Sequence, residues 1–209
     1  VGSEMCIRDR FLLSENMAGI LAVLYTSLAA LPVPFQPVHL LFINLLTDSL
    51  PALAIGMEPA ERDVLSEKPR NPKGGILERR FMALLLGQGA LIAVCTMISF
   101  EVGLKESAAL ASTMAFATLT LARLFHGFNC RSRHSIVKIG FRRNWYSLGA
   151  FALGVLLLAL VLFVPALKPL FEVEKMNGMQ LGCVGVMAVL PTFVIQSFKV
   201  VGEVSGREK

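Results

Sequence analysis

The sequence alternates between long apolar runs and short charged stretches, and residues 151–167 form one such run. An apolar segment of about 20 residues is long enough to cross a bilayer core about 30 Å thick. By this criterion the chain has six candidate spans, at about 11–31, 38–57, 81–100, 108–128, 145–165 and 179–198. The predicted fold class is therefore all-α: a polytopic membrane protein with a bundle of six transmembrane helices.

The two ends of the chain differ from this apolar part. Residues 1–10 match neither a signal peptide nor the segment that follows, and we interpret them as a non-native or artefactual segment. The six-helix domain is assigned to residues 11–200, and residues 201–209 to a cytoplasmic tail.

The composition excludes two other classes of protein. Of the 209 residues, 55% are hydrophobic and 17% are charged, whereas soluble domains carry about 25% charged residues. The chain is therefore neither an ordinary soluble enzyme nor disordered. Its net charge of +5 comes from loops and forms no continuous basic stripe, so we expect a lipid bilayer and no nucleic acid as a partner.

The distribution of basic residues predicts an orientation. Of the 20 lysines and arginines, 16 lie in the terminal segments and in the 58–80 and 129–144 loops, which share one side of the membrane if there are six spans. The positive-inside rule makes that side cytoplasmic, with both termini on it.

One predicted span carries a carboxylate near its middle. Charged groups at this depth are costly and are functional candidates by default. Asn44, Thr47 and Asp48 share one helix face, and Pro51 frees the backbone carbonyl of Thr47. A broken helix with a carboxylate and a free carbonyl is a common cation site, and oxygen ligands favour calcium, magnesium or manganese. Interhelical hydrogen bonding is the alternative role for this cluster.

The neighbouring span supplies a fourth metal-ligand candidate, Asn16, because a turn of about six residues makes the first two spans antiparallel neighbours. Asn16, Asn44, Thr47 and Asp48 offer about five oxygens, fewer than the 6–8 that calcium takes. A further polypeptide segment is therefore expected to complete the site.

The other polar residues of the predicted spans receive structural interpretations. Arg123 and His126 are expected to snorkel to the interface, and Glu15 either to reach the interface or to act functionally. Gln88 and Gln196 are interpreted as packing residues, and the glycines beside Gln88 as points of close helix contact.

The segment from Asn44 to Pro59 resembles the sixth transmembrane helix of the P-type cation ATPases, most closely the calcium-pump group. The segment from Phe11 to Asn16 is similar to helix five of these pumps, and Phe125–Cys130 to the end of helix eight. The resemblance covers about residues 11–200. It implies that the chain is the C-terminal membrane region, helices five to ten, and that Asn16, Asn44, Thr47 and Asp48 match cation ligands.

The resemblance also carries expectations about the complete pump. Two-site calcium pumps carry glutamates at the position of Gly19 and on helix eight, where residues 118–122 contain none. This implies one divalent cation per cycle, calcium or manganese, with calcium the more expected cargo. ATP and Mg²⁺ would be bound by domains that this chain lacks, together with helices one to four. Because the chain has no phosphorylation motif, we expect it to hold no catalytic or cofactor-binding residue and to be inactive alone. The expected location is a bacterial plasma membrane.

Two readings from other classes stay open at this point. Half of a secondary ion-coupled transporter would show internal repeats, whereas Asn-x-x-Thr-Asp occurs once. A non-catalytic membrane scaffold would tolerate the substitution Asp48→Ala without loss of transport.

Overall fold

Every regular element in the described part of the chain is a helix, which confirms the all-α prediction. The computed structural model describes residues 2–47, 49–57, 79–130 and 144–204. The elements are α1 (Gly2–Leu28), α2 (Pro37–Phe42), the π-helical turn η1 (Ile43–Thr47), α3 (Ser49–Gly56), α4 (Arg79–Leu104), α5 (Ala108–Cys130), α7 (Trp145–Phe163), α8 (Lys168–Phe171) and α9 (Gly178–Val204).

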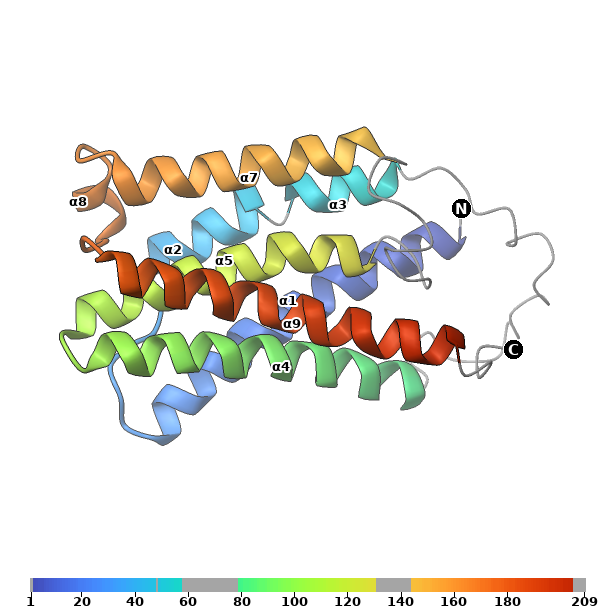
Figure 1. The fold of residues 1–209 in the computed structure, drawn as a ribbon, viewed down its shortest axis with the longest axis horizontal. Coiled ribbons are helices and arrows are strands. Elements are labelled where there is room, and N and C mark those ends of the chain that lie inside the picture. The colour runs from blue at the N-terminus through green and yellow to red at the C-terminus, as the bar shows by residue number, and fades with distance from the viewer. Residues whose placement is uncertain (1, 48, 58–78, 131–143, 205–209) are drawn as a thin grey trace.

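The long helices lie side by side along one direction and form a bundle (Figure 1). The start of α1 and the end of α9 lie at the same end of the bundle. The connections at residues 29–36, 105–107 and 164–177 lie at the opposite end. This up-and-down arrangement is the one that short connections between antiparallel helices produce.

Four helical segments are long and apolar enough to cross a membrane: Met82–Leu104, Ala108–Cys130, Trp145–Phe163 and Gly178–Gly202. They correspond to the last four predicted spans. The first predicted span coincides with the apolar part of α1, Leu12–Leu28, and the second with α2, η1 and α3. The total of six spans stays a prediction. The backbone of residues 2–10 continues α1 as helix, which does not test the origin of that segment.

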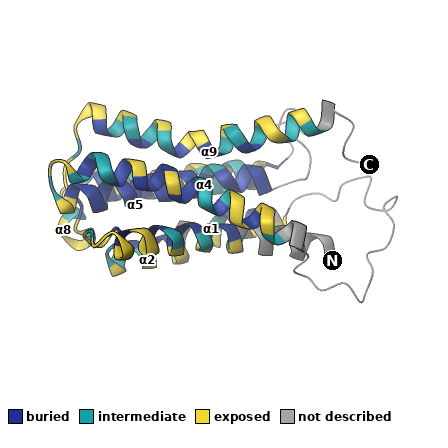
Figure 2. Ribbon diagram, turned by 90° about the horizontal axis from the view of Figure 1, so that it is seen from below, coloured by how far each residue is buried: buried dark blue, intermediate teal, exposed yellow. Residues whose placement is uncertain are grey.

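Helix α5 lies at the centre of the bundle and is buried along most of its length (Figure 2). It packs against α1, α4, α7 and α9. Small side chains allow this, since Ala111, Ala115 and Ala122 are fully buried. At the start of α5, Gly103 of α4 lies so close that an ideal Cβ there would be 2.7 Å from Ala111 Cα. Close helix packing through small residues is typical of membrane bundles.

The turn between α1 and α2 is defined by local chemistry. Ala30 adopts a left-handed conformation with φ of 53°, and Pro37 occupies the first turn of α2. The backbone N–H of Gln36 donates to Nδ1 of the buried His39, whose Nε2 lies 2.6 Å from the carbonyl oxygen of Phe171. The His39 ring also stacks on Phe116 at 4.3 Å. These contacts fix the start of α2, which leads directly into the segment with Asn44 and Thr47.

Candidate cation-binding site

The predicted second span is an interrupted helix. Its first part, α2, runs into the π-helical turn η1 at Ile43–Thr47, and regular α-helix resumes at Ser49. Asn44 and the backbone of Thr47 therefore lie within the interruption. Asp48 lies outside the described residues, so its predicted role stays a prediction. The Oγ of Ser49 donates to the carbonyl oxygen of Asn44 at 3.4 Å, a weak link across the interruption.

Two of the four ligand candidates have described side chains, Asn16 on α1 and Asn44 on η1. Both are exposed, although their neighbours Glu15 and Ile43 are fully buried. Helix α1 packs against α3, which places the helix that bears Asn16 beside the interrupted helix. The candidates therefore lie on the outside of the described bundle, and additional ligands from another polypeptide segment would have access to them.

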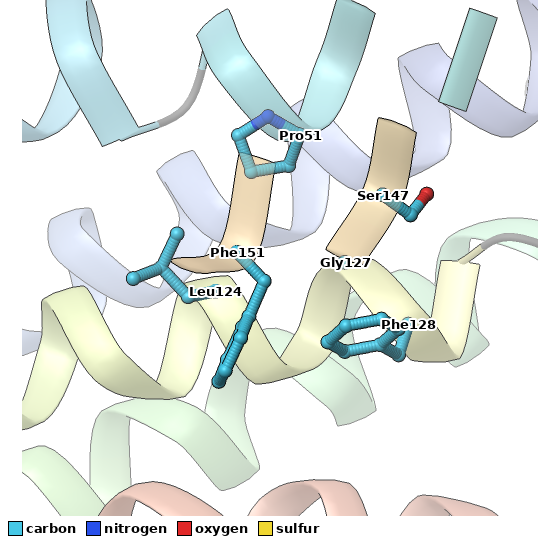
Figure 3. A pocket seen from close by; sticks show the side chains of 6 residues that line it. All are labelled: Pro51, Leu124, Gly127, Phe128, Ser147 and Phe151. Carbon is cyan, nitrogen blue, oxygen red and sulfur yellow. The ribbon is translucent and has the colours of Figure 1, made fainter. Parts of the chain in front are cut away.

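Pro51 forms one wall of a small hollow between α3, α5 and α7 (Figure 3). The hollow is partly open to the surface and has room for about one water molecule. Its other lining residues are Leu124, Gly127, Phe128, Ser147 and Phe151. Proline cannot donate the backbone hydrogen bond that would continue the helix. Its place just after the interruption explains why α2 and α3 are separate helices.

The expectation that Arg123 and His126 snorkel to the interface was wrong. Arg123 is 2% exposed and His126 is fully buried. The guanidinium Nη2 of Arg123 donates to the backbone carbonyl oxygen of Glu15 at 2.6 Å, and Glu15 is itself buried. An ideal Cβ at Gly19 would lie 3.2 Å from the same Nη2. The guanidinium of Arg123, which is always charged, therefore lies against the face of α1 that carries Gly19, one turn from Asn16.

His126 belongs to a buried polar network at the same end of α5. Asn129 Nδ2 lies 3.3 Å from His126 Nδ1. Nε2 of the same ring faces the Ser14 Oγ on α1 at 3.1 Å and the Cys130 Sγ at 3.3 Å. Gln196 on α9 donates to Asn129 Oδ1 at 2.7 Å, and this bond supports the packing role expected for Gln196. The network joins α1, α5 and α9.

One of the two glycines beside Gln88 mediates a close helix contact. An ideal Cβ at Gly89 would lie 2.9 Å from the backbone oxygen of Ser14 and 3.1 Å from Met17 Cβ. At Gly87 a Cβ would meet nothing within 4 Å. The expectation of close contact is therefore confirmed for Gly89 and is wrong for Gly87.

Sequence reasoning missed Asn144, which is 3% exposed. Its Nδ2 donates to the carbonyl oxygen of Ala54 on α3 at 2.9 Å, and its Oδ1 caps α7. An asparagine before an apolar run is a helix-capping signal in the sequence, but nothing in the sequence indicated the second bond. Among the described residues, no three His, Cys, Asp or Glu side chains are grouped so as to hold a metal ion.

A bundle of apolar helices with an interrupted helix that carries oxygen-bearing side chains is an arrangement found in the membrane domains of ion transporters. The chain belongs to the family described as "Cation transporting ATPase, C-terminus", whose sequence model matches residues 32–201. This confirms the resemblance to the P-type cation ATPases and favours a pump over half of a secondary transporter.

Relatives of this chain include a calcium-transporting ATPase of Bacillus subtilis (strain 168), 39% identical over 189 residues. That alignment covers 89% of this chain and 21% of the relative. Calcium-transporting ATPase 1 of Lactococcus lactis is 37% identical, with 92% and 22% covered. Calcium-transporting ATPase type 2C member 2 of Rattus norvegicus is 32% identical, with 82% and 19% covered. The chain thus spans about a fifth of the length of the curated relatives that it matches.

Proposed function

We propose that this chain is the C-terminal membrane part of an ATP-driven divalent cation pump that exports calcium. The observation that carries the proposal is the interruption at η1 in a chain of the cation-transporting ATPase family. Relatives whose names state calcium transport support calcium as the cargo. Manganese shares the same oxygen-ligand chemistry and is the competing cargo.

The proposed ligands are Asn16, Asn44, Thr47 and Asp48. The π-helical turn holds Asn44 and Thr47 where regular backbone hydrogen bonding is disturbed, so carbonyl oxygens become available beside the side chains. Asp48 would supply the negative charge. Asn16 and Asn44 are exposed, so an ion bound at their amides would also be within reach of ligands from helices one to four of the complete pump.

A single ion per cycle is the proposed stoichiometry, and Arg123 supports it. In two-site pumps of this group a glutamate stands at the position of Gly19, whereas here the Arg123 guanidinium lies 3.2 Å from where that Cβ would be. The guanidinium thus occupies the space that a glutamate side chain at this position would need, which disfavours a second site beside Gly19.

ATP and Mg²⁺ would bind to the cytoplasmic domains of the complete pump. Phosphorylation there would move the helices, open the site outward and release the ion. In this proposal the chain supplies ligands and moving helices, does not hydrolyse ATP alone, and has both ends on the cytoplasmic side of a bacterial plasma membrane.

The test is a chimera in which residues 11–209 replace the matching segment of the Bacillus subtilis relative. Calcium-dependent ATP hydrolysis and calcium uptake are measured in membrane vesicles. Asp48→Asn keeps the shape of the side chain and removes its charge, and we expect it to abolish calcium activation. Asp63→Asn in the 58–80 loop is the matched control, because no ligand is predicted there, and we expect it to leave activation unchanged.

The transport ratio tests the second part of the proposal. We expect about one calcium ion per ATP, as a single site requires. A measured ratio of two would overturn the single-site argument built on Arg123. If the chimera is active and Asp48→Asn leaves its calcium affinity unchanged, the proposed ligand role is wrong. The cluster of Asn44, Thr47 and Asp48 would then serve only in helix packing.

A further inference from the structure

The interruption at η1 creates a positioning problem for α3. Helix α3 has only eight residues, Ser49–Gly56, and it follows a π-helical turn in which the regular α-helical hydrogen-bond pattern is replaced. A helix this short is not stable by itself and takes its orientation from its neighbours. Its orientation matters to the proposed site because Asp48 comes directly before it.

Helix α3 packs against α1, α5 and α7. Near its start, the buried Pro51 borders the small hollow shared with α5 and α7 (Figure 3). A side chain beside unfilled space forgoes part of its dispersion contacts. A specific polar contact would fix the orientation of α3 further.

Asn144 provides that contact at the other end of α3. The side-chain amide Nδ2 donates to the carbonyl oxygen of Ala54 at 2.9 Å. The carbonyl of Ala54 also accepts from the backbone N–H of Met57 at 3.2 Å, where the helix ends. Asn144 therefore adds a second donor to a carbonyl at the C-terminal end of α3, where regular intrahelical bonding ends.

The same side chain begins α7. The Oδ1 of Asn144 accepts from the backbone N–H groups of Tyr146 at 2.9 Å and Ser147 at 3.2 Å. One amide thus joins the C-terminal end of α3 to the N-terminal end of α7. Asparagine is suited to this because it presents an acceptor and a donor at once. Aspartate keeps the acceptor but lacks the donor, and its charge repels the Ala54 carbonyl.

Helix α7 is in turn fixed to the centre of the bundle. The ring of Phe151 lies 5.0 Å from that of Phe125 and 5.2 Å from that of Phe128, both on α5. Gly154 allows Leu124 to come so close that an ideal Cβ would be 2.5 Å from Leu124 Cδ2. The Asn144 amide therefore sets α3 relative to α5, the helix that also carries Arg123.

We infer that Asn144 is a positioning residue for cation binding, which holds α3 in the orientation that the ion site needs. This inference rests on the proposed function and adds to it a residue outside the ligand set. Loss of the bond to Ala54 should weaken cation binding and leave turnover at saturating cation nearly unchanged.

The test uses the chimera described above with the variant Asn144→Asp. This variant retains the α7 cap and removes the donor to Ala54. The half-activating calcium concentration should rise about tenfold, the effect of losing one buried hydrogen bond of about 1.4 kcal/mol. The maximal rate should stay within about twofold, because the variant changes the binding geometry and not the remote chemistry.

Asn177→Asp is the matched control. Asn177 accepts from the backbone N–H of Gln180 at 2.9 Å, just before the start of α9, so it has the same local role as Asn144 without a bond to α3. We expect this variant to leave the half-activating concentration unchanged. If Asn144→Asp does not accumulate in membranes, Asn144→Ser, which keeps a capping oxygen without adding charge, should still raise that concentration.

The outcomes separate the two proposals. A wild-type chimera without cation-activated ATP hydrolysis counts against the proposed function. An activated chimera in which Asn144→Asp and Asn144→Ser keep the wild-type half-activating concentration overturns the positioning role. The same applies if Asn177→Asp raises that concentration as much as Asn144→Asp, because capping alone would then explain the effect.

Discussion

Gly89 and Gly87 lie two residues apart on α4 and provide a matched pair of substitutions to alanine. At Gly89 the added Cβ would lie 2.9 Å from the Ser14 backbone oxygen and 3.1 Å from Met17 Cβ, both on α1. At Gly87 it would meet nothing within 4 Å. Because a backbone oxygen has no rotamer to change, Gly89→Ala must push α4 away from α1.

The expected magnitude follows from two opposing terms. Replacing glycine by alanine inside a helix stabilises it by about 1 kcal/mol, and this gain is the same at both positions. Overpacking costs about 1–3 kcal/mol and applies only at Gly89. The difference between the variants should therefore be about 1–3 kcal/mol. This corresponds to about 2–12 °C in the unfolding midpoint of a region of this size.

The assay is thermal inactivation of the chimera in membranes, with half-activating calcium as a second readout. We expect Gly89→Ala to be inactivated at a lower temperature than Gly87→Ala. It should also need more calcium, since the displaced part of α1 carries Asn16. Equal midpoints for the two variants would show that α1 and α4 are not in the close contact described, and the reasoning would fail.

Two further substitutions test the packing of α5. Gly103→Ala places a Cβ 2.7 Å from Ala111 Cα and 2.9 Å from its backbone nitrogen, so we expect a lower thermal midpoint than for Gly89→Ala; a wild-type midpoint would contradict this. Arg123→Met removes the charged donor to the carbonyl of Glu15 at 2.6 Å. We expect a loss of about 1.5–3 kcal/mol in stability, seen as a lower midpoint that Arg123→Lys partly restores.

The sequence was sufficient to predict the helical fold, because the thickness of the bilayer sets the length of the apolar runs that cross it as helices. The turn at residues 32–37 and the break near Pro51 could also be predicted, because the proline ring fixes φ and removes a backbone donor wherever it occurs. The π-helical form of the interruption could not be predicted, because apolar patterning and the position of proline do not distinguish a π-helical turn from another kind of helix break.

Arg123 and His126 show why the polar residues were harder to interpret. Their position near a helix end fits snorkelling, and only the packing of α1 and α9 against α5 reveals that both are buried. A partner 108 residues away, such as the carbonyl of Glu15, leaves no local signal in the sequence. The second hydrogen bond of Asn144 escaped prediction for the same reason, because Ala54 is 90 residues away.

The polar contacts join α5 to the helices around it. Asn129 and its partners on α9 hold α5 from one side, and Arg123 holds α1 from the other. Helix α5 thus serves as the common reference for α1 and, through α7 and Asn144, for α3. The ligand candidate Asn16 is exposed on α1, and Asn44 is exposed on η1, which lies next to α3. Small movements of α1 or α3 against α5 would therefore change the spacing of the ligand candidates. A site that must bind an ion in one state and release it in another requires this kind of coupling.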